Sequence, residues 1–372
     1  MSSGPLAGVT VIENASYISG PLAGLLLAQL GADVVKVEAP GAGDPFRRWG
    51  GAAAGVRVRP QFAALNHGKR SVALDLRTPE GRSGYLELVA GAGALVENFR
   101  PGTLDRLGAG EGAVRERNPG IVYVTVTGFG PAGPYRDRPA YDAIVQAVSG
   151  LWSLFSPVSR PQAVGPALAD TLSGLHGALA VAAGLAGTAR RDDAPRRLDV
   201  SMLAASLGLA GLSVATYAAT GEVEGPESRG RRSHSIALRA GDGRPLAVHL
   251  SSPEKFWLRL TDVVGRPDLR DDDRFSSYPA RLEHFDELRA ELEAALAGEP
   301  RKSWLERLHE ADVPAAPISS VDEVVTDPHV VGAGLLRQAS GPAGERFLVP
   351  RGAIGFAGDL DACPMEVPAL GG

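Results

Sequence analysis

The chain has 372 residues and a formal net charge of −5, from 38 basic and 43 acidic side chains. This balance excludes the broad cationic surface that general nucleic-acid binding requires, so we expect no nucleic-acid partner. Hydrophobic residues make up 44% of the chain and charged residues 22%, as in an ordinary globular protein large enough for two packed units. The single cysteine, Cys363, has no partner for an intrachain disulfide, which favours a reducing, cytoplasmic location.

The first residues have neither a basic start nor an apolar core with a cleavage signal, so no export peptide is predicted. The most apolar stretch, residues 203–219, is shorter than the roughly 20 residues that a bilayer requires, and serine, threonine and glycine residues interrupt it. We interpret this stretch as a buried helix and expect no membrane contact.

Short β-branched runs alternate with longer helical stretches from Val9 onward. The pattern predicts strands at residues 9–13, 33–38, 71–76, 94–98, 121–126 and 196–202, and helices at 21–32, 79–93, 141–150 and 170–189. Continuous apolar strands between amphipathic helices are typical of a parallel sheet covered on both faces. The sequence therefore predicts an α/β fold with a doubly wound, Rossmann-like large domain.

The composition changes after Thr220. Residues 221–235 are polar, charged and without period, which indicates a connector. A strand at 245–252 and helices that include Trp257, residues 285–296 and Trp304 then predict a smaller α/β unit. We therefore expect a large domain at residues 1–224 and a small domain at 225–327. The Gly/Pro-rich residues 328–372 are too few to fold alone and should return to the large domain.

The sequence lacks the common cofactor and nucleophile motifs. The first strand–helix junction reads ENASYISGPLAG in place of GxGxxG, which disfavours a dinucleotide, and neither GxxxxGK[ST] nor GxSxG occurs. The seven histidines are scattered, without HExxH or paired cysteines, so no metal site is predicted.

Basic residues gather near the ends of the predicted strands. The three clusters are Arg47 with Arg48, Lys69 with Arg70, and Arg100 with Arg106. Guanidinium and ammonium groups bind phosphate well, so together the clusters could hold a phosphorylated cofactor. Any one of them alone is equally compatible with solvated surface charge.

Ordered motifs run nearly end to end along the chain: SGPLAGLLLAQLGADVVKVEAPGAGDPFR, LNHGKRSVALDL, VENFRPGTLDRLG, NPGIVYVTVTGFGPAGPY, PAYDAIVQAVSG, GPALADTLSGLHGALA, DVSMLAA and VPAAPISSVDEVVTDPHV. With these motifs the chain resembles the family III coenzyme A transferases, which include formyl-CoA, carnitine and bile-acid CoA transferases and have α-methylacyl-CoA racemase as a relative. The resemblance implies a Rossmann-like large domain made from both chain ends, a small domain between them, and an interlocked, ring-like homodimer.

The resemblance also implies an activity. An acyl-CoA and a carboxylic acid would be the substrates, coenzyme A the group transferred, and an aspartyl–acyl anhydride the intermediate, with no metal. The attacking aspartate falls on Asp170 in ALADTLSG. Backbone N–H groups at a helix start stabilise a carboxylate, although an aspartate there is often only an N-cap. The residues implied to contact coenzyme A are Tyr17, Ile18, Arg47, Lys69, Arg70, Asn98, Phe99, Arg106, Tyr141 and Met202.

Departures from the family pattern bear on the alternatives. Formyl-CoA transferase has a glutamine where Ile18 stands, so an apolar wall replaces an amide and favours a bulkier, less polar acyl group. The racemase relatives have a GHD-type motif where this chain has AYD, so Tyr141 replaces a histidine and the racemase alternative lacks its second acid/base group. A non-catalytic CoA-binding or nucleotide-binding protein is the third alternative, disfavoured by Asp170 and by the missing glycine motif.

Overall fold

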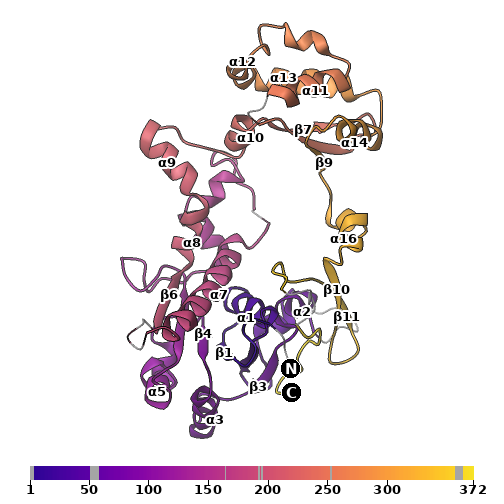
Figure 1. Cartoon of the computed structure of the whole chain (residues 1–372). Coiled ribbons are helices and arrows are strands. Elements are labelled where there is room, and N and C mark those ends of the chain that lie inside the picture. The colour runs from indigo at the N-terminus through magenta and orange to yellow at the C-terminus, as the bar shows by residue number, and fades with distance from the viewer. Residues whose placement is uncertain are drawn as a thin grey trace. The chain divides into compact units, whose positions relative to one another are not determined.

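The structure is a computed structural model, and it describes residues 4–50, 58–163, 165–191, 193, 196–251, 254–356 and 363–372. The chain divides into two compact units (Figure 1). The first contains Met1–Trp152, Val164–Val214 and Gly332–Gly372, and the second contains Ser153–Ala163 and Ala215–Val331. Both chain ends thus belong to the first unit. The boundaries after residues 214 and 331 differ from the expected ones after 224 and 327.

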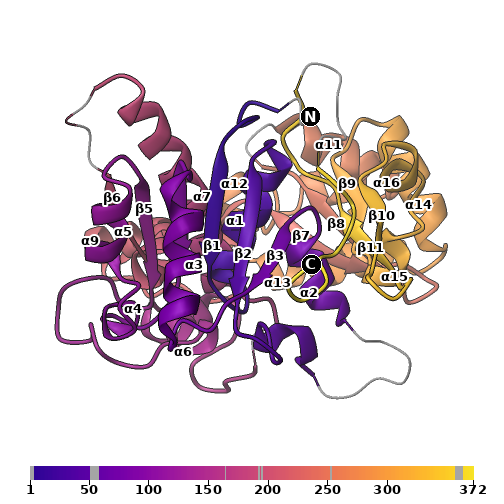
Figure 2. The same cartoon turned by 90° about the horizontal axis from the view of Figure 1, so that it is seen from below.

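Among the described residues of the first unit, six parallel strands form one sheet in the order β3-β2-β1-β4-β5-β6. They are β1 (Thr10–Asn14), β2 (Asp33–Glu38), β3 (Arg70–Ala73), β4 (Ala94–Glu97), β5 (Val122–Thr127) and β6 (Arg197–Ser201). This order confirms the doubly wound α/β prediction. Figure 2 shows the strands side by side with α3 (Pro79–Ala90) in front of them. The strand order reverses between β1 and β4, where sheets of this kind bind ligands at their carboxyl ends.

Helices cover both faces of the sheet. On one face α1 (Ser19–Gln29) and α7 (Leu168–Thr188) contribute Leu27 and Val181 to a core with the strand valines. On the other face α3 and α5 (Glu111–Arg117) contribute Tyr85 and Val114. Helix α3 begins where the sequence predicts, at Pro79. The preceding Thr78 caps the helix, because its hydroxyl accepts the Gly81 N–H.

Two apolar segments have different surroundings. Among the described helices α7 alone is long and apolar enough to cross a bilayer, and Val181 and its neighbours pack in the sheet core. The other segment forms two helices, α8 (Met202–Leu209) and α9 (Gly211–Thr220), with a bend of 66° between them. Only the two helices taken together are long and apolar enough to cross a bilayer. The prediction of one buried helix over 203–219 is therefore wrong. No residue of α9 is buried in this chain, and Leu212 is 79% exposed.

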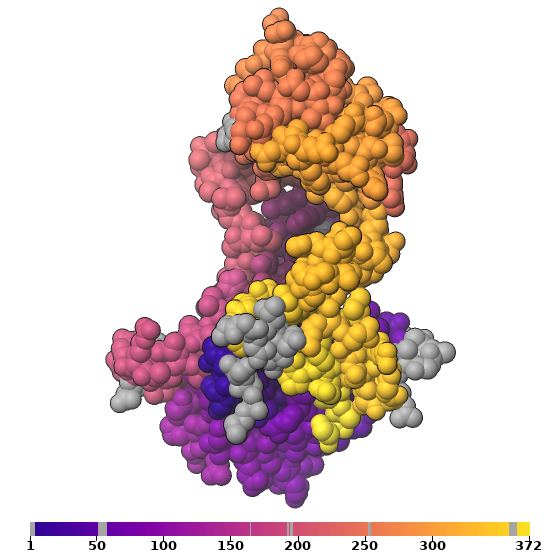
Figure 3. All heavy atoms as spheres, turned by 45° about the vertical axis from the view of Figure 1, so that its right-hand side comes forward, coloured from indigo at the N-terminus to yellow at the C-terminus, as the bar shows by residue number. Residues whose placement is uncertain are grey.

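The C-terminal residues pack on the start of the first unit. The antiparallel strands β10 (Leu336–Ser340) and β11 (Arg346–Pro350) bury Ala339 and Phe347 against Phe62 of α2 (Pro60–Asn66). Figure 3 shows the yellow C-terminal residues on the surface of this unit beside its violet residues. The remaining short elements of this unit are η1 (Pro45–Arg48), α4 (Thr103–Arg106) and α6 (Asp142–Val148), and the division between the units falls within η2 (Leu151–Leu154) and α16 (Pro328–Gly332).

The second unit has an antiparallel sheet of β7 (Ser235–Arg239), β8 (Pro245–His249) and β9 (Ala315–Pro317). Its core includes Trp257, Leu292 and Trp304, from helices α11 (Glu254–Val263), α13 (Phe285–Leu296) and α14 (Arg301–Glu310). The shorter helices are α10 (Ser228–Arg232), η3 (Pro267–Arg270), α12 (Tyr278–Glu283) and α15 (Val321–Val324). Helix α10 lies inside the predicted connector, where an ion pair joins Glu227 to Arg231 one turn later.

Candidate active site

Asp170 lies in the first turn of α7, whose N-terminus is at the carboxyl-end edge of the sheet. The helix has Ala167 at its N-cap, which offers no side-chain acceptor. Asp142 supplies the cap, because its Oδ1 accepts the N–H groups of Ala169 at 2.9 Å and of Asp170 at 3.2 Å. Across the described residues, no hydrogen bond or ion pair engages the Asp170 carboxylate. Asp170 is therefore not the N-cap, and its carboxylate is free to react.

The electrostatic surroundings of Asp170 favour its protonated form. Burial raises the pKa of Asp170 to about 7, and the negative charge of Asp142 adds to the rise. The helix N-terminus favours the ionised form, as expected from the sequence. Burial and the second carboxylate outweigh it. Because the nucleophilicity of an anion rises with its basicity, as it does for thiolates, the ionised fraction is more reactive than an ordinary aspartate.

Asp142 is itself held in place from two sides. It begins α6, and the Gln146 side chain one turn later donates to its Oδ2 at 2.6 Å and to the Pro166 carbonyl at 3.1 Å. These bonds join the start of α6 to the loop before α7. Tyr141, the N-cap residue of α6, projects its ring outward and is 64% exposed.

Helices α1 and α7 cross where small residues leave no space between them. A Cβ atom added at Gly174 would lie 2.8 Å from the Ser19 carbonyl oxygen, and one at Gly177 would lie 3.1 Å from the Ala23 Cβ. The later glycine of α7 faces the later residue of α1, so the two helices run in the same direction. Their N-terminal ends therefore lie together.

This crossing places the start of α1, directly after the predicted residues Tyr17 and Ile18, near the first turn of α7, which holds Asp170. Asp170 precedes Gly174 by one turn, about 6 Å along the axis on the same helix face, and Ile18 precedes Ser19. A second contact agrees, because the rings of Tyr17 and Tyr141 meet edge to face with centroids 6.3 Å apart.

The Tyr17 ring also begins a row of aromatic side chains. Its centroid is 6.2 Å from that of Phe46, which is 5.4 Å from that of Trp49. Phe46 is buried, whereas the Tyr17 and Trp49 rings are partly exposed. Phe46 and Trp49 were not predicted as site residues from the sequence, although they flank the predicted Arg47 in the segment GAGDPFRRW.

Asn98 links the end of β4 to the same loop. Its Nδ2 donates to the Ser16 carbonyl at 2.8 Å and to the Ser19 hydroxyl at 3.2 Å, and its Oδ1 accepts the Ser16 N–H at 3.0 Å. The Asn98 amide, which was expected to contact coenzyme A, is thus bonded to Ser16 and Ser19 and holds the β1–α1 loop in place. The neighbouring Phe99 N–H donates to Glu97 at 2.7 Å.

Two of the basic residues expected to hold phosphate are buried in ion pairs. The fully buried Lys69 amino group contacts Glu13 at 2.6 Å and donates to the Pro21 carbonyl at 2.7 Å and to Asn66 at 2.9 Å. Burial lowers the pKa of Lys69 to about 8, although Glu13 opposes the shift. With three donors in use, its expected phosphate role does not fit this arrangement.

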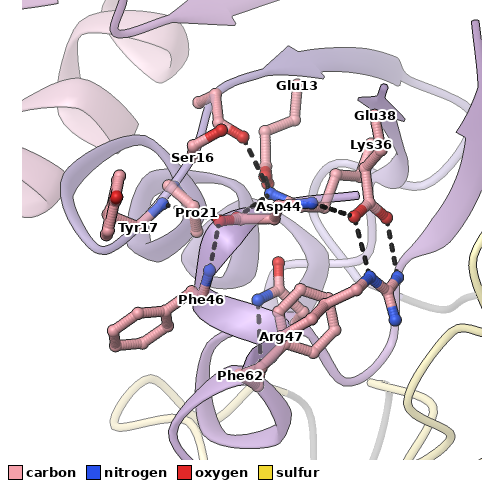
Figure 4. A network of polar contacts seen from close by, with 12 residues as sticks. Glu13, Ser16, Tyr17, Pro21, Lys36, Glu38, Asp44, Phe46, Arg47 and Phe62 are labelled. Carbon is pink, nitrogen blue, oxygen red and sulfur yellow. Dashed lines mark hydrogen bonds and ion pairs between the residues drawn. The ribbon is translucent and has the colours of Figure 1, made fainter. Parts of the chain in front are cut away.

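Arg47 is similarly engaged. Its guanidinium forms a fork with Glu38, at 2.8 Å from Nε and 2.7 Å from a terminal nitrogen (Figure 4). Its other terminal nitrogen donates to the Pro368 carbonyl at 3.1 Å. The fork connects the β2 end to the C-terminal residues. Met202, also expected to contact the coenzyme, is buried in the sheet core. Both side chains therefore have structural roles here.

The other two basic residues expected to hold phosphate, Arg70 on β3 and Arg106 on α4, are exposed. Arg70 is exposed and paired with Asp33, and Arg106 is exposed and donates to the Thr103 hydroxyl at 3.0 Å. A pocket of about 470 Å³ opens at the ends of β4 and β5. Its lining includes Phe99, Arg100, Arg115, Arg136 and Arg197, together with Glu97, Glu111 and Asp199. Burial raises the pKa of Glu97 to about 7.

Comparisons with known proteins agree on one family. The sequence model described as CoA-transferase family III matches residues 6–372. The chain is 34% identical to acetyl-CoA:oxalate CoA-transferase of Acetobacter aceti over 91% of its own length and 87% of the relative's. It is 30% identical to human succinyl-CoA:glutarate CoA-transferase, over 95% and 80% of the two chains. The crystal structure of a CAIB/BAIF family protein from Brucella suis superposes with a TM-score of 0.87 at 32% identity, covering 100% and 97%.

The pH titration of Asp170 tests the electrostatics of the site. In carbon-13 NMR of carboxyl-labelled protein, we expect the Asp170 signal to shift with an inflection near pH 7, its pKa being about 7. Asp142→Asn keeps an oxygen for the cap but removes the negative charge, so the inflection should move to lower pH. An unchanged inflection in Asp142→Asn would contradict the assigned cause, and Asp170→Asn identifies the signal by its loss.

Proposed function

Because the chain belongs to CoA-transferase family III, we propose that Asp170 is the nucleophile through which it moves coenzyme A from an acyl-CoA to a carboxylic acid. The observation that carries the proposal is the Asp170 carboxylate itself. It lies at a helix N-terminus that another aspartate caps, has no internal partner among the described residues, and has a pKa of about 7.

The chemistry divides one acyl exchange into balanced steps. An Asp170 oxygen attacks the thioester carbonyl, the C–S bond breaks, and the CoA thiolate leaves as an aspartyl–acyl anhydride forms. The thiolate then attacks the aspartyl carbonyl and releases the donor acid, which leaves an aspartyl thioester. The acceptor carboxylate then attacks the aspartyl thioester, which releases the CoA thiolate and forms a second anhydride. The thiolate attacks the acceptor acyl carbonyl of this anhydride, so the new acyl-CoA leaves and Asp170 is regenerated. No net proton or electron is exchanged.

The side chains beside Asp170 suggest which acyl groups fit. The partly exposed rings of Tyr17 and Tyr141 would give the site an apolar lining, and Ile18 packs against the core that includes Phe46 behind them. Apolar and aromatic walls bind bulky, weakly polar acyl groups better than small dianionic ones. We therefore propose a larger, less polar acyl group than formyl or oxalyl, which the aromatic row would accommodate.

The phosphates of coenzyme A need cations that are not already paired in the interior. Arg106 and the pocket residue Arg100 meet this condition, since both are exposed near the ENFRPG turn. Guanidinium groups bind phosphate through paired N–H donors. We assign the phosphate contacts to these two arginines rather than to Lys69 and Arg47.

A pair of variants tests this assignment. Arg106→Ala should raise the KM for acyl-CoA by about tenfold with a smaller change in kcat, because a remote phosphate contact binds ground and transition states alike. Lys69→Met should instead lower the free energy of unfolding by about 3 kcal/mol, since it removes a buried partner of Glu13. Thermal denaturation and steady-state kinetics of both variants check this. A folded Lys69→Met protein of normal stability with a raised KM would reverse the assignment.

The nucleophile itself is tested by Asp170→Asn. The amide keeps the size of the carboxylate, so coenzyme A binding should persist while acyl exchange falls by about four orders of magnitude. Mass spectrometry after incubation with acyl-CoA and hydroxylamine should find the modification on Asp170 in the unchanged protein. Full exchange activity in Asp170→Asn would contradict the proposal.

The same assay separates transfer from racemisation. Acyl transfer never breaks the α-C–H bond, so a chiral 2-methylacyl-CoA incubated in heavy water should keep its hydrogen and configuration. Tyr141, which stands where the racemases have histidine, is a poor base at neutral pH. Rapid deuterium incorporation without an acceptor acid would favour the racemase instead.

We also propose that two copies of the chain form a homodimer through α7 to α9. Several leucines on these helices are exposed in the single chain: Leu175, Leu179, Leu207, Leu209 and Leu212. An apolar surface of this kind is covered in a stable protein, and the family resemblance favours a second copy over another partner.

Sedimentation equilibrium tests the homodimer. The unchanged protein should sediment at about twice its chain mass of 38.6 kDa, and Leu212→Glu should shift it toward the monomer, because a charge on an interface costs desolvation. Leu258→Glu, on the exposed side of α11 in the second unit, is the matched control and should leave the dimer intact. A monomer that binds neutral lipid vesicles would show that a membrane covers the helices.

A further inference from the structure

Tyr17 adopts a backbone conformation that a tyrosine seldom takes. Its φ is 65°, in the left-handed region that glycine and asparagine tolerate and bulky residues disfavour. It stands in the loop between β1 and α1, and the α1 N-cap, Ile18, has no side-chain cap. Such a conformation persists only where the surrounding contacts hold it, so the loop needs an external restraint.

The restraint comes from Asp44, in the loop after β2. Its Oδ1 accepts the N–H groups of Tyr17 at 3.2 Å and of Phe46 at 2.9 Å (Figure 4). Its Oδ2 forms an ion pair with Lys36 at 2.9 Å. One buried carboxylate thus fixes the Tyr17 backbone and also the Phe46 ring against which the Tyr17 ring packs.

Asp44 is held rigidly by buried charges. The fully buried Lys36 amino group also contacts Glu13 at 2.7 Å and donates to the Ala15 carbonyl at 2.8 Å. The Asp44 N–H donates to Glu38 at 2.8 Å. In a region of low dielectric these charges cannot separate without exposing an unpaired ion, so the position of Asp44 is fixed by the sheet.

We propose that Asp44 is a positioning residue for acyl transfer, because it holds Tyr17 and Ile18 in the conformation that places them beside Asp170. The inference rests on the proposed function of Asp170. Asp44 touches neither the nucleophile nor the thioester. Its part is to set the backbone on one wall of the site, through the restraint at Tyr17 and the contact of the Tyr17 ring with Tyr141, next to Asp142.

The first test is Asp44→Ala, with Asp272→Ala as its matched control. Asp272 accepts the N–H of Arg274, two residues later, as Asp44 accepts that of Phe46, but it lies in the second unit. Asp44→Ala should lower kcat by about tenfold with the KM for acyl-CoA changed by less than about threefold, since a misplaced site wall costs reaction rate. Asp272→Ala should keep the kcat. A folded Asp44→Ala protein with unchanged kcat would overturn the proposal.

A double-mutant cycle separates positioning from general stability. Glycine accepts the left-handed conformation without restraint, so Asp44→Ala should cost much less kcat in a Tyr17→Gly background than in the unchanged protein. Amide hydrogen exchange of a peptide over residues 16–19 should be faster in Asp44→Ala, a readout independent of activity. Additive kcat losses with unchanged exchange would show that Asp44 acts only on stability.

If Asp44→Ala fails to fold, Asp44→Asn decides. The amide keeps an oxygen for the Tyr17 N–H, so its kcat should stay within about threefold while its melting temperature falls through loss of the Lys36 pair. Loss of activity as complete as in Asp170→Asn would overturn positioning. Asp170→Asn is measured alongside: if that variant remains active, the proposed function has failed, and if only the Asp44 predictions fail, this inference alone has failed.

Discussion

The carboxylate of Asp142 is the group on which the rest of the site depends. An aspartate in the first turn of a helix usually binds the free N–H groups and becomes a weaker base. Here Asp142 takes those N–H groups from outside the helix, at 2.9 and 3.2 Å. Asp170 is thereby left without them, and it meets a second negative charge instead. The same carboxylate therefore fixes the start of α7 and raises the pKa of Asp170.

The buried ion pairs beneath the site explain why the first basic clusters are not ligand sites. Lys36 and Lys69 share Glu13, and Arg47 forms a fork with Glu38, all in the interior. A buried cation must have partners, because an unpaired one costs several kcal/mol. The two arginines that we propose for phosphate, Arg100 and Arg106, stand instead in the exposed ENFRPG turn and at the end of the short helix α4, where water reaches them. The same buried ion pairs also hold Asp44 rigidly, and Asp44 in turn restrains the strained backbone of Tyr17.

The fold was largely predictable because its signals are local. Alternating apolar strands and helices place β2 at its observed residues and the other sheet strands within a few residues of theirs. The break between α8 and α9 was not predictable in the same way, since Gly211 in an apolar run is also compatible with a continuous helix. Exposure of α9 depends on what covers it, which no local pattern encodes.

For the site, the resemblance indicated Asp170, Tyr17 and Ile18, and in the structure the starts of α1 and α7, where these residues stand, lie near each other. The roles of Lys69, Arg47 and Asn98 could not be read from the sequence, because a basic or amide side chain near a strand end can face either water or a buried carboxylate. The roles of Asp142 and Asp44 are not visible in the sequence for a related reason. Each acts through a contact with a residue 27 or 28 positions away, which only the folded chain brings within reach.

If Asp170 acts as the proposed nucleophile, the two carboxylates of the site also bear on the energetics of the first step. While Asp170 is ionised, its charge faces that of Asp142 in a largely buried setting, and this repulsion raises the energy of the free site. Formation of the anhydride turns the Asp170 carboxylate into a neutral acyl group, so the repulsion is released as the C–S bond breaks. Asp142 meanwhile keeps its bonds to α7 and does not need to reorganise. The residue that caps the helix thus destabilises the reactant relative to the acylated enzyme, and a neutral cap would hold the helix equally well without that effect.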